Sequence, residues 1–346
     1  MQELIRTFSK EALSALIRAR PGELKLGEKI QLCGNDWPGD LKNSSCRFVL
    51  FGIPEDIGVR ANQGRGGAHT AWKPALESFL NQQDNEFIHS ADILLLGEVN
   101  VDDLMEACEG KTGRDVSDLD FLKQQVARLD ERVTLVMKAA VESGKTALVI
   151  GGGHNNAYGN IKGASMAIKA PLNVLNCDPH LDFRSLEGRH SGNGFRYAFE
   201  EKFLGRYAVL GMHEQYNNRA VMESFRANAD RVYSVSYEDI FVREKVSFQE
   251  AIQHCLSFLG QEACAVEIDM DAITNVPSSA KTSSGVSPLE ARQFVYRAAL
   301  DRNCVYLHIA EAAPVLSHIK ADNKTGKLIA YLLSDFIKGV REREMA

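Results

Sequence analysis

The feature that most constrains the fold of this chain is a series of short apolar runs, separated by longer segments of helical pattern. Most of these runs show little polar alternation, which is typical of strands buried on both faces of a parallel sheet. Such an alternation of strands and helices predicts a three-layer α/β/α sandwich with a mainly parallel sheet of about eight strands. The predicted strands are Arg47–Ile53, Asp92–Gly97, Thr146–Ile150, Leu172–Asn176, Tyr207–Gly211, Arg231–Val235, Cys264–Ile268 and Cys304–Ile309.

The clearest helical patterns are Phe121–Glu142 and Pro288–Asp301. The second follows Ser287, with Glu290 three residues later, which predicts a capping box with proline at the first helical position. We expect Gly326–Arg341 to form a helix near the end of the chain. The helices therefore separate or follow the predicted strands, as the sandwich requires.

The chain contains no internal repeat, low-complexity tract or proline-rich linker, and we therefore predict a single catalytic domain over residues 46–346. Residues 1–45 are predicted to form a helical N-terminal extension, with a turn around Asn35–Gly39. In open α/β sheets, ligands bind just beyond the carboxyl ends of the strands. The polar residues that follow the predicted strands are accordingly the first candidates for a functional site.

Charge and composition exclude several kinds of partner. The formal net charge of −6 provides no basic footprint for nucleic acid, and no apolar stretch reaches the roughly 18 residues of a membrane span. The N-terminal residues lack the apolar core of a signal peptide. The seven cysteines are scattered and never spaced as C-x-x-C, which indicates buried thiols and a reducing, cytoplasmic location.

Three potential metal ligands follow the predicted strand Leu172–Asn176 directly. Asp178, His180 and Asp182 alternate along the chain, so that an extended backbone would point all three side chains the same way. Carboxylates with an imidazole suit a divalent ion such as manganese or zinc. By itself this motif could equally be a polar loop.

Two further clusters follow predicted strands. Gly151–Asn155 comes after Thr146–Ile150 and would present His154, although a nucleotide-binding loop or a plain turn would look the same. Asp269 and Asp271 come after Cys264–Ile268, where a solvated turn is the competing interpretation. Four converging carboxylates would repel one another unless cations neutralise them, and two divalent ions match four aspartates in charge. Together the clusters predict a binuclear metal centre.

These motifs resemble the signatures of the ureohydrolases, which include arginase, agmatinase and formimidoylglutamase. The resemblance covers roughly residues 47–315 and is carried by Gly-Gly-Gly-His-Asn at 151–155, Asp-x-His-x-Asp at 178–182 and Asp-x-Asp at 269–271. It implies the arginase fold and two Mn²⁺ per chain, although zinc, cobalt or nickel would also suit the ligands. The resemblance assigns His154 and Asp182 to one ion, His180 and Asp271 to the other, and Asp178 and Asp269 as bridges between them.

The same resemblance makes Glu311 the residue that grips the amidine or guanidine nitrogens of the substrate. A carboxylate opposite the metals could hold a planar cation and place its central carbon for attack. The competing interpretation is a glutamate at a helix N-terminus.

The loop Arg189–Arg196 resembles the formimidoylglutamase loop Ser-Gly-Thr-Pro-Phe-Arg, whereas agmatinases tend to have His-Gly-Thr there. Glycine-rich residues 52–68 resemble the same branch. A substrate with the two carboxylates of glutamate requires cations nearby, which would repel cationic agmatine. The predicted substrate contacts are Arg189, Ser191, Asn193, Arg196 and Glu311, with Arg60 or Arg65 as further candidates.

Some residues depart from the family pattern. Pro179 replaces the usual alanine, which should stiffen the motif without removing a ligand. Ala272–Asn275 replaces a segment that commonly reads x-x-Asp-Pro, and Pro277-Ser278 replaces Pro-Gly. These departures border the expected pocket and therefore bear on the substrate more than on the chemistry.

The expected reaction is hydrolysis of a C–N bond in a linear amidine, with N-formimidoyl-L-glutamate giving L-glutamate and formamide. Asp182 or Asp271 could accept a proton while remaining a metal ligand. His190 is a candidate proton shuttle to the leaving amine, because imidazole titrates near working pH. His213 is a weaker candidate and is better explained as a packed histidine.

Three alternatives remain open at the level of the sequence. An agmatinase or guanidino-acid hydrolase would release urea from a related substrate. A zinc deacetylase of related fold would hold one zinc. A catalytically silent homologue would serve as a binding or structural subunit, although six intact ligands argue against it. By analogy with its relatives, the protein would be a homo-oligomer, a trimer or a hexamer.

Overall fold

A computed structural model describes residues 2–317 and 323–346 of the chain and shows a ten-stranded central sheet. All eight predicted strands are present, with ends that differ from the prediction by up to three residues. Two further strands of two residues each come from the N-terminal segment. The strands are β1 (Ile5–Arg6), β2 (Gln31–Leu32), β3 (Phe48–Gly52), β4 (Ile93–Val99), β5 (Thr146–Ile150), β6 (Leu172–Cys177), β7 (Leu204–Met212), β8 (Val232–Ser236), β9 (Cys264–Asp269) and β10 (Cys304–Ala310).

The sheet has the order β1-β4-β3-β5-β10-β9-β6-β7-β8, and β2 also pairs with β4. The eight predicted strands run parallel to one another, and β1 lies antiparallel to β4 at the edge. Parallel neighbours require long crossover connections, which the intervening helices supply. The prediction of a mainly parallel three-layer sandwich is therefore confirmed, with ten strands in place of about eight.

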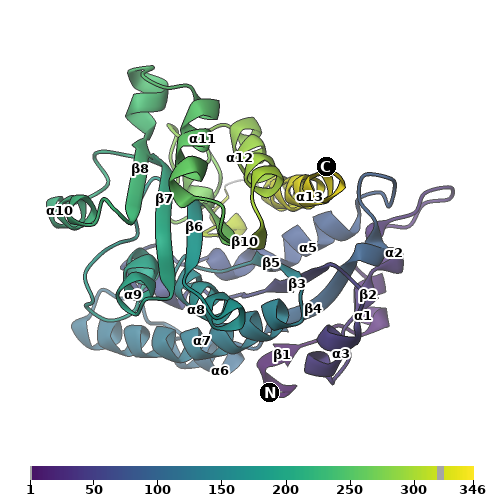
Figure 1. The fold of residues 1–346 in the computed structure, drawn as a ribbon. Coiled ribbons are helices and arrows are strands. Elements are labelled where there is room, and N and C mark those ends of the chain that lie inside the picture. Colours follow the sequence, from purple (N-terminus) through teal and green to yellow (C-terminus); the bar gives the residue numbers. More distant parts are fainter. Residues whose placement is uncertain (1, 318–322) are drawn as a thin grey trace.

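Helices cover both faces of the sheet (Figure 1), and the buried apolar residues form two cores. One core contains residues of α5, α11, α12 and α13, and the other contains residues of α4 and α6 to α10. The helices are α1 (Lys10–Ser14), α2 (Leu26–Lys29), α3 (Trp37–Asn43), α4 (Ile57–Ala61), α5 (Trp72–Leu80), α6 (Asp102–Ala107), α7 (Val116–Glu142), α8 (Asn156–Ile168), α9 (Gly194–Glu200), α10 (Arg219–Ala227), α11 (Phe248–Leu259), α12 (Pro288–Asp301) and α13 (Lys324–Met345).

The predicted helices agree well with the observed ones. Helix α12 has the predicted bounds, and Ser287 and Glu290 form the expected capping box. Helix α7 begins five residues before the predicted start, because the side chain of Asp115 caps it by accepting from the backbone N–H of Ser117. Helix α13 also extends beyond the predicted helix at both ends.

The N-terminal segment differs from the helical extension that we expected. Of residues 2–45, only three short helices are α-helical, and β1 and β2 both pair with β4 at the edge of the sheet. The expected turn at Asn35–Gly39 is limited to Asn35 and Asp36, because α3 begins at Trp37 and has Pro38 in its first turn. This segment therefore extends the central sheet, while the division of the chain into domains stays a prediction.

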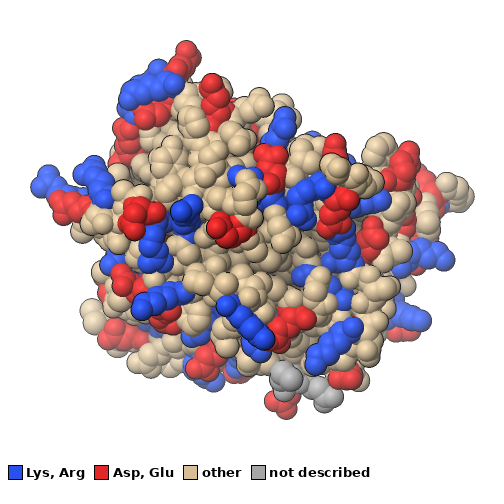
Figure 2. Space-filling view, in the orientation of Figure 1, with Lys and Arg blue, Asp and Glu red and all other residues tan. Residues whose placement is uncertain are grey.

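On the face shown in Figure 2, lysine and arginine side chains are interspersed with aspartate and glutamate. None of the helices in residues 2–317 and 323–346 is both long enough and apolar enough to cross a membrane. All seven cysteines are free and buried, and three of them, Cys177, Cys264 and Cys304, lie in β6, β9 and β10.

Candidate metal centre

The three predicted ligand clusters lie at one edge of the sheet. They follow β5, β6 and β9, and β10 runs between β5 and β9 in the strand order. The carboxyl ends of these four adjacent parallel strands therefore meet in one place, and Glu311 comes directly after β10. The topology brings together residues that are far apart in the sequence, as expected for a site in an open α/β sheet.

His154 lies at the centre of the first group of ligand atoms. Its Nδ1 is 3.1 Å from Asp178 Oδ2, 3.1 Å from Asp182 Oδ2 and 3.2 Å from Asp269 Oδ2. His154 and Asp178 are fully buried, and Asp269 is nearly so. These four residues can direct one ligand atom each to a common point.

A second group adjoins the first. His180, Asp269 and Asp271 also bring ligand atoms close together, so that Asp269 belongs to both groups. Asp178 faces both histidines, because its Oδ2 approaches His154 and its Oδ1 lies 3.5 Å from His180 Nδ1. The two residues expected to act as bridges therefore lie between the two groups.

The side chains converge through local turns, whereas we expected an extended backbone. Residues 178–182 lie beyond the end of β6, and Asp178 Oδ1 accepts a hydrogen bond of 2.7 Å from the backbone N–H of His180. Asp269 Oδ1 likewise accepts a 2.6 Å bond from the backbone N–H of Asp271. In both motifs the first aspartate folds the chain back upon itself, as aspartate commonly does in turns.

Two non-glycine residues of the site have left-handed backbone conformations. The φ angles are 45° at Asp182 and 64° at Glu311. Such conformations are unfavourable for residues with a side chain and persist only where surrounding structure imposes them. From these backbone conformations both carboxylates line the site.

The electrostatics of the cluster show that it is under strong like-charge repulsion. Burial raises the pKa of Asp182, Asp269 and Asp271, and the neighbouring carboxylates add to this for Asp182 and Asp269. Burial alone would lower the pKa of His154, but the surrounding carboxylates raise it well above its usual value. Divalent ions at this position would balance the charge of the carboxylates.

The residues present fit divalent metal ions. Both ring nitrogens of His154 are buried and have no hydrogen-bond partner within the described chain. Buried polar atoms are nearly always paired in folded proteins, so that unpaired atoms require an explanation. Imidazole nitrogens and carboxylate oxygens together match the ligand preferences of manganese and zinc.

Glu311 faces the same site from β10. Its Oε1 accepts a 2.8 Å hydrogen bond from the backbone N–H of His154, whereas its buried Oε2 has no hydrogen-bond partner among residues 2–317 and 323–346. Its own N–H donates to the carbonyl of Gly152, so that it does not begin a helix. Burial, together with Asp269 and Asp271, raises its pKa well above the usual value. Glu311 therefore presents one free oxygen to the site.

A cleft of about 320 Å³ opens beside the ligands. Of the predicted substrate contacts, Ser191 and Glu311 line this cleft. Asn62, Arg184 and Tyr216 also line it, and none of the three was predicted as a site residue. Arg184 follows Asp182 by two residues, which was the available signal, and its Nη1 donates to Asn62 Oδ1 at 2.7 Å. Arg184 therefore supplies a guanidinium group to the cleft wall.

Arg189 does not line the cleft, contrary to our expectation. Its Nε forms a buried ion pair of 2.8 Å with Asp130 of α7, and its guanidinium lies over the rings of Tyr158 and Tyr197. Its remaining donors bind Asn193 Oδ1 and backbone carbonyls. The N–H groups of Arg189 donate to partners within the protein and are not available to a substrate. Arg189 therefore anchors the loop.

Asn193 and Arg196 of the same loop do not line the cleft either, unlike Ser191. Asn193 is buried and bonds Arg189 and the backbone of its own loop. Arg196 bonds Ser224 and forms a 2.6 Å ion pair with Glu200. Arg196 lines a neighbouring cavity of about 250 Å³, which shares Arg184 with the cleft.

Neither histidine considered as a proton shuttle lines the cleft. His190 is buried, and its Nδ1 accepts from the backbone N–H of Gly192. Burial and the nearby Arg184 lower its pKa to about 4, which removes it from the range of a shuttle at neutral pH. His213 is stacked between Tyr216 and Tyr237, as expected for a packed histidine.

Arg60 and Arg65 have structural partners. Arg60 pairs with Asp56 at 2.8 Å and donates to the carbonyl of Cys108, and Arg65 donates to the carbonyl of Ser279 at the rim of the cleft. The two arginines therefore brace loops around the site, and Arg60 has no contact with the cleft.

Glu55, a fully buried carboxylate in the first glycine-rich loop, was not among the predicted site residues. Its Oε1 accepts hydrogen bonds from Gly153 N at 2.9 Å and from Asn156 Nδ2 at 2.6 Å. Its Oε2 accepts from the N–H of Ile57. A Cβ atom on Gly152 would lie 1.9 Å from the carbonyl oxygen of Glu55, so this close approach requires glycine. Glu55 thereby holds the turn that presents His154.

Comparisons with known proteins agree with this geometry. A family model described as the arginase family matches residues 46–338. The formimidoylglutamase of Streptococcus pyogenes is 29% identical over 311 residues, which cover 84% of this chain and 86% of that protein. The solved formimidoylglutamase of Bacillus subtilis gives a TM-score of 0.74 at 19% identity, covering 94% of both chains. A Trypanosoma cruzi formiminoglutamase solved with Mn²⁺ gives 0.69 at 18% identity, covering 93% of this chain and 99% of that one.

Proposed function

Since this chain belongs to the arginase family, we propose that it hydrolyses the C–N bond of N-formimidoyl-L-glutamate to give L-glutamate and formamide. The observation that carries this proposal is the cleft in which the ligand groups, the free oxygen of Glu311 and the guanidinium of Arg184 meet. The substrate is suggested by the formimidoylglutamases among the relatives.

The proposed cofactor is two Mn²⁺ per chain, and the ligand types would also suit zinc, cobalt or nickel. The proposed ligands are the six residues His154, Asp178, His180, Asp182, Asp269 and Asp271. When bound at such a site, divalent ions supply activation of water at neutral pH.

The side chains of the cleft have separate proposed roles. Glu311 Oε2 would accept hydrogen bonds from the amidine nitrogens and thereby orient the formimidoyl carbon. Asp182 would accept the proton that the attacking water loses, because it lies at the cleft wall beside the ligand cluster. No shuttle is assigned to His190, which lies outside the cleft and remains neutral at working pH.

Arg184 is the proposed partner of a substrate carboxylate, in place of Arg189. It is about half exposed, and Asn62 and Glu187 hold its guanidinium at the cleft wall. Ser191 lies next to it and accepts from Asn62 Nδ2 at 3.2 Å. A guanidinium at this position favours an anionic substrate and disfavours a cationic one such as agmatine.

The competing function is a guanidino-compound hydrolase that releases urea. It deserves a test because a hypothetical agmatinase from Burkholderia thailandensis and an agmatine ureohydrolase from Thermoplasma volcanium share the fold, each with a TM-score of 0.67. A single-zinc deacetylase is less compatible with two adjoining ligand groups. A silent homologue is less compatible with the complete ligand set.

A substrate panel on manganese-loaded protein separates these functions. We expect formamide release from N-formimidoyl-L-glutamate to exceed urea release from agmatine and from guanidino acids. Urea release from a guanidine with no formamide release would overturn the proposed substrate. Turnover of none of these compounds, with two Mn²⁺ bound per chain, would support the silent homologue.

We further propose that the protein works in the cytoplasm and assembles as a homo-oligomer. Seven free, buried cysteines suit a reducing compartment. The trimeric or hexameric state rests on analogy with the family, and the mass of the native protein in solution tests it.

A further inference from the structure

A second group of buried polar residues lies directly behind His154. Glu267, Tyr306 and His308 come from β9 and β10 and are fully buried. Tyr306 donates a 2.7 Å hydrogen bond to Glu267 Oε1, and His308 Nδ1 lies 2.5 Å from Glu267 Oε2. A carboxylate buried between two strands is costly unless its oxygens are well paired, which these two residues achieve.

The position of Glu267 follows from the same strand pairing that places the metal-type ligands. His308 is paired in register with Glu267, and Ala310 is paired with Asp269. Because side chains alternate along a strand, Glu267 and Asp269 point to the same side of β9. Asp269 therefore approaches Nδ1 of His154, and Glu267 approaches Nε2 of the same ring.

The ring of His154 has an unpaired nitrogen on each side. Its Nδ1 faces the aspartates of the candidate metal centre, and its Nε2 lies 3.5 Å from Glu267 Oε2. A neutral imidazole carries one proton, so that the nitrogen opposite the metal-type ligands must be the donor. Glu267 Oε2 is an acceptor at the place where that donor points.

Two aromatic rings pack against the imidazole of His154, and Glu267 can fix the orientation of that imidazole. The edge of Phe195 contacts His154 with ring centroids 5.1 Å apart, and His308 lies 6.1 Å away on a tilted plane. A Cβ on Gly151 would lie 2.1 Å from His308 Nε2, so the glycine-rich turn leaves room for that ring. The turn, His308 and His154 are thus packed as one unit.

We propose that Glu267 is a positioning residue that accepts a hydrogen bond from His154 Nε2–H and so keeps Nδ1 unprotonated and directed at the metal centre. Tyr306 and His308 hold Glu267 in place for this role. Hydrogen bonds from the far nitrogen of a histidine ligand to a carboxylate orient the ring and increase metal affinity. This inference rests on the metal centre of the proposed function.

The test is Mn²⁺ binding by calorimetry to the full-length chain and its Glu267→Gln variant. Glutamine preserves the shape but can present an NH₂ group to His154, and we expect roughly 10- to 100-fold weaker binding of Mn²⁺. Tyr306→Phe is the matched control, because it removes one bond to Glu267 but leaves Oε2 in place, and should weaken binding less. Binding by Glu267→Gln within twofold of wild type would overturn the proposal.

A thermal melt with and without Mn²⁺ distinguishes positioning from a structural role. A ligand that binds the folded state raises Tm according to its affinity. We expect the Mn²⁺-induced rise in Tm to shrink in Glu267→Gln, whereas a structural role would lower only the metal-free Tm and preserve the rise. If Glu267→Gln does not fold, His308→Asn carries the same comparison with Tyr306→Phe as its control, and an unchanged rise in His308→Asn would overturn the proposal.

These outcomes are distinguishable from failure of the proposed function. Wild-type protein that binds Mn²⁺ but releases no formamide would refute the substrate and leave the role of Glu267 standing. Wild-type protein that releases formamide while Glu267→Gln binds Mn²⁺ normally would refute only the role of Glu267.

Discussion

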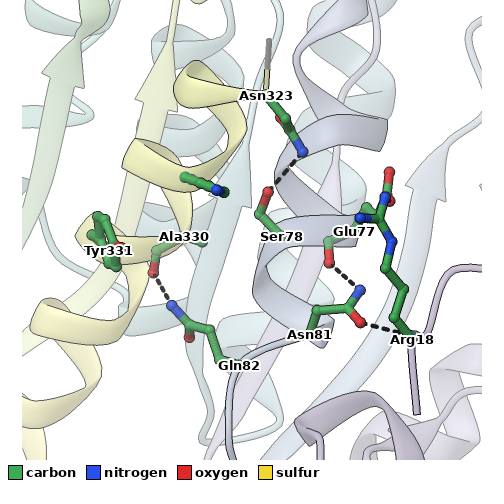
Figure 3. Close-up of a pocket in the computed structure, with 9 residues that line it drawn as sticks. Arg18, Glu77, Ser78, Asn81, Gln82, Asn323, Ala330 and Tyr331 are labelled. Atoms are coloured by element: carbon green, nitrogen blue, oxygen red, sulfur yellow. Dashed lines mark hydrogen bonds and ion pairs between the residues drawn. The ribbon is translucent and has the colours of Figure 1, made fainter. Parts of the chain in front are cut away.

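Two cavities of this molecule are lined by polar side chains, but they differ in how those side chains are paired. The cavity between α5 and α13 has a volume of about 460 Å³ and exceeds the cleft of about 320 Å³ beside the metal-type ligands. In the larger cavity Asn81 Nδ2 donates to the carbonyl of Glu77, and Asn323 Nδ2 donates to Ser78 (Figure 3). Arg18 also pairs with Glu77 at 2.6 Å. These side chains tie neighbouring segments together.

The smaller cleft has the opposite character. Within the described residues, three buried atoms at this site have no hydrogen-bond partner, namely both ring nitrogens of His154 and Oε2 of Glu311. The described lining of the larger cavity has one such atom, Asn323 Oδ1, and no cluster of like charges surrounds it. Leaving a buried polar group unpaired costs about 1–3 kcal/mol. From this comparison we expect the ligand in the cleft, where unpaired polar atoms lie close to like charges, and not in the larger cavity. Five predictions test it.

The largest expected effect belongs to Asp269→Asn. Asp269 contributes to both groups of ligand atoms, so that its loss should impair binding of both ions. We expect kcat/KM to fall by more than about 100-fold, since removing even a residue behind a ligand costs roughly 10- to 100-fold. Metal analysis should find fewer than two Mn²⁺ per chain, and full activity with two bound ions would refute the bridging assignment.

Glu311→Gln should separate substrate orientation from metal binding. The amide oxygen can still accept from His154 N, but the free oxygen becomes an NH₂ group that cannot accept from an amidine. We expect kcat/KM to fall by roughly 100-fold, the size typical for loss of a group that stabilises the transition state. Mn²⁺ stoichiometry should stay at the wild-type value. An unchanged kcat/KM would show that Glu311 does not touch the substrate.

Arg184→Ala tests the anionic substrate. Hydrogen bonds to charged groups contribute roughly 1.5–3 kcal/mol, and we therefore expect KM for N-formimidoyl-L-glutamate to rise by about 10-fold or more. Steady-state kinetics with an amidine that lacks carboxylates provides the control, since its KM should not change. The control variant Arg189→Lys should instead lower Tm, because lysine cannot replace the two hydrogen bonds that Arg189 donates to Asp130. Equal effects of Arg184→Ala on both substrates would contradict the assignment.

The lowered pKa of His190 should make the stability of the fold depend on pH. Its pKa is about 4 in the folded protein and about 6.5 in an unfolded chain, because it is buried. Between these values the unfolded state binds more protons, so that stability falls as pH decreases from 6.5 to 4. This group contributes a slope of up to about 1.4 kcal/mol per pH unit. In His190→Asn the denaturation midpoint should change less with pH between 4 and 6.5. An unchanged slope would show that other groups cause the pH dependence.

The smallest effect on activity is expected in the larger cavity. Asn81 accepts from the backbone of Arg18 and donates to two carbonyls, and Asn81→Ala should therefore destabilise the fold by about 1–3 kcal/mol. We expect kcat/KM to remain within about twofold of wild type, since the cavity serves packing. Urea denaturation and steady-state assays measure both quantities. A large loss of activity in a folded variant would reverse the comparison between the two cavities.

Much of the fold could be predicted because its signals are local. Each apolar run is short and continuous, and Ser287 with Glu290 forms a cap within four residues, so that neither requires knowledge of distant segments. The edge strands β1 and β2 were not predicted, because two-residue strands have no periodicity of their own. They exist only because β4 offers them a partner.

The metal-type ligands of the candidate site could also be predicted from local signals. His154, Asp178 and Asp269 follow strands whose parallel arrangement brings their ends together. Glu267 lies inside a predicted strand, and the sequence around it does not indicate which side chains it pairs with. Its meaning depends on His154, which lies far away in the sequence and 3.5 Å away in space.

By itself, the sequence determined which strands end in ligand-type residues, since hydrophobic pattern and turn chemistry act over a few residues. Only the tertiary structure decided which arginine faces the cleft. Arg189 turns inward because Asp130, 59 residues earlier, pairs with it, and Arg184 is left at the cleft wall. A long side chain takes the direction of its strongest partner, and that partner is determined by the packing of distant segments.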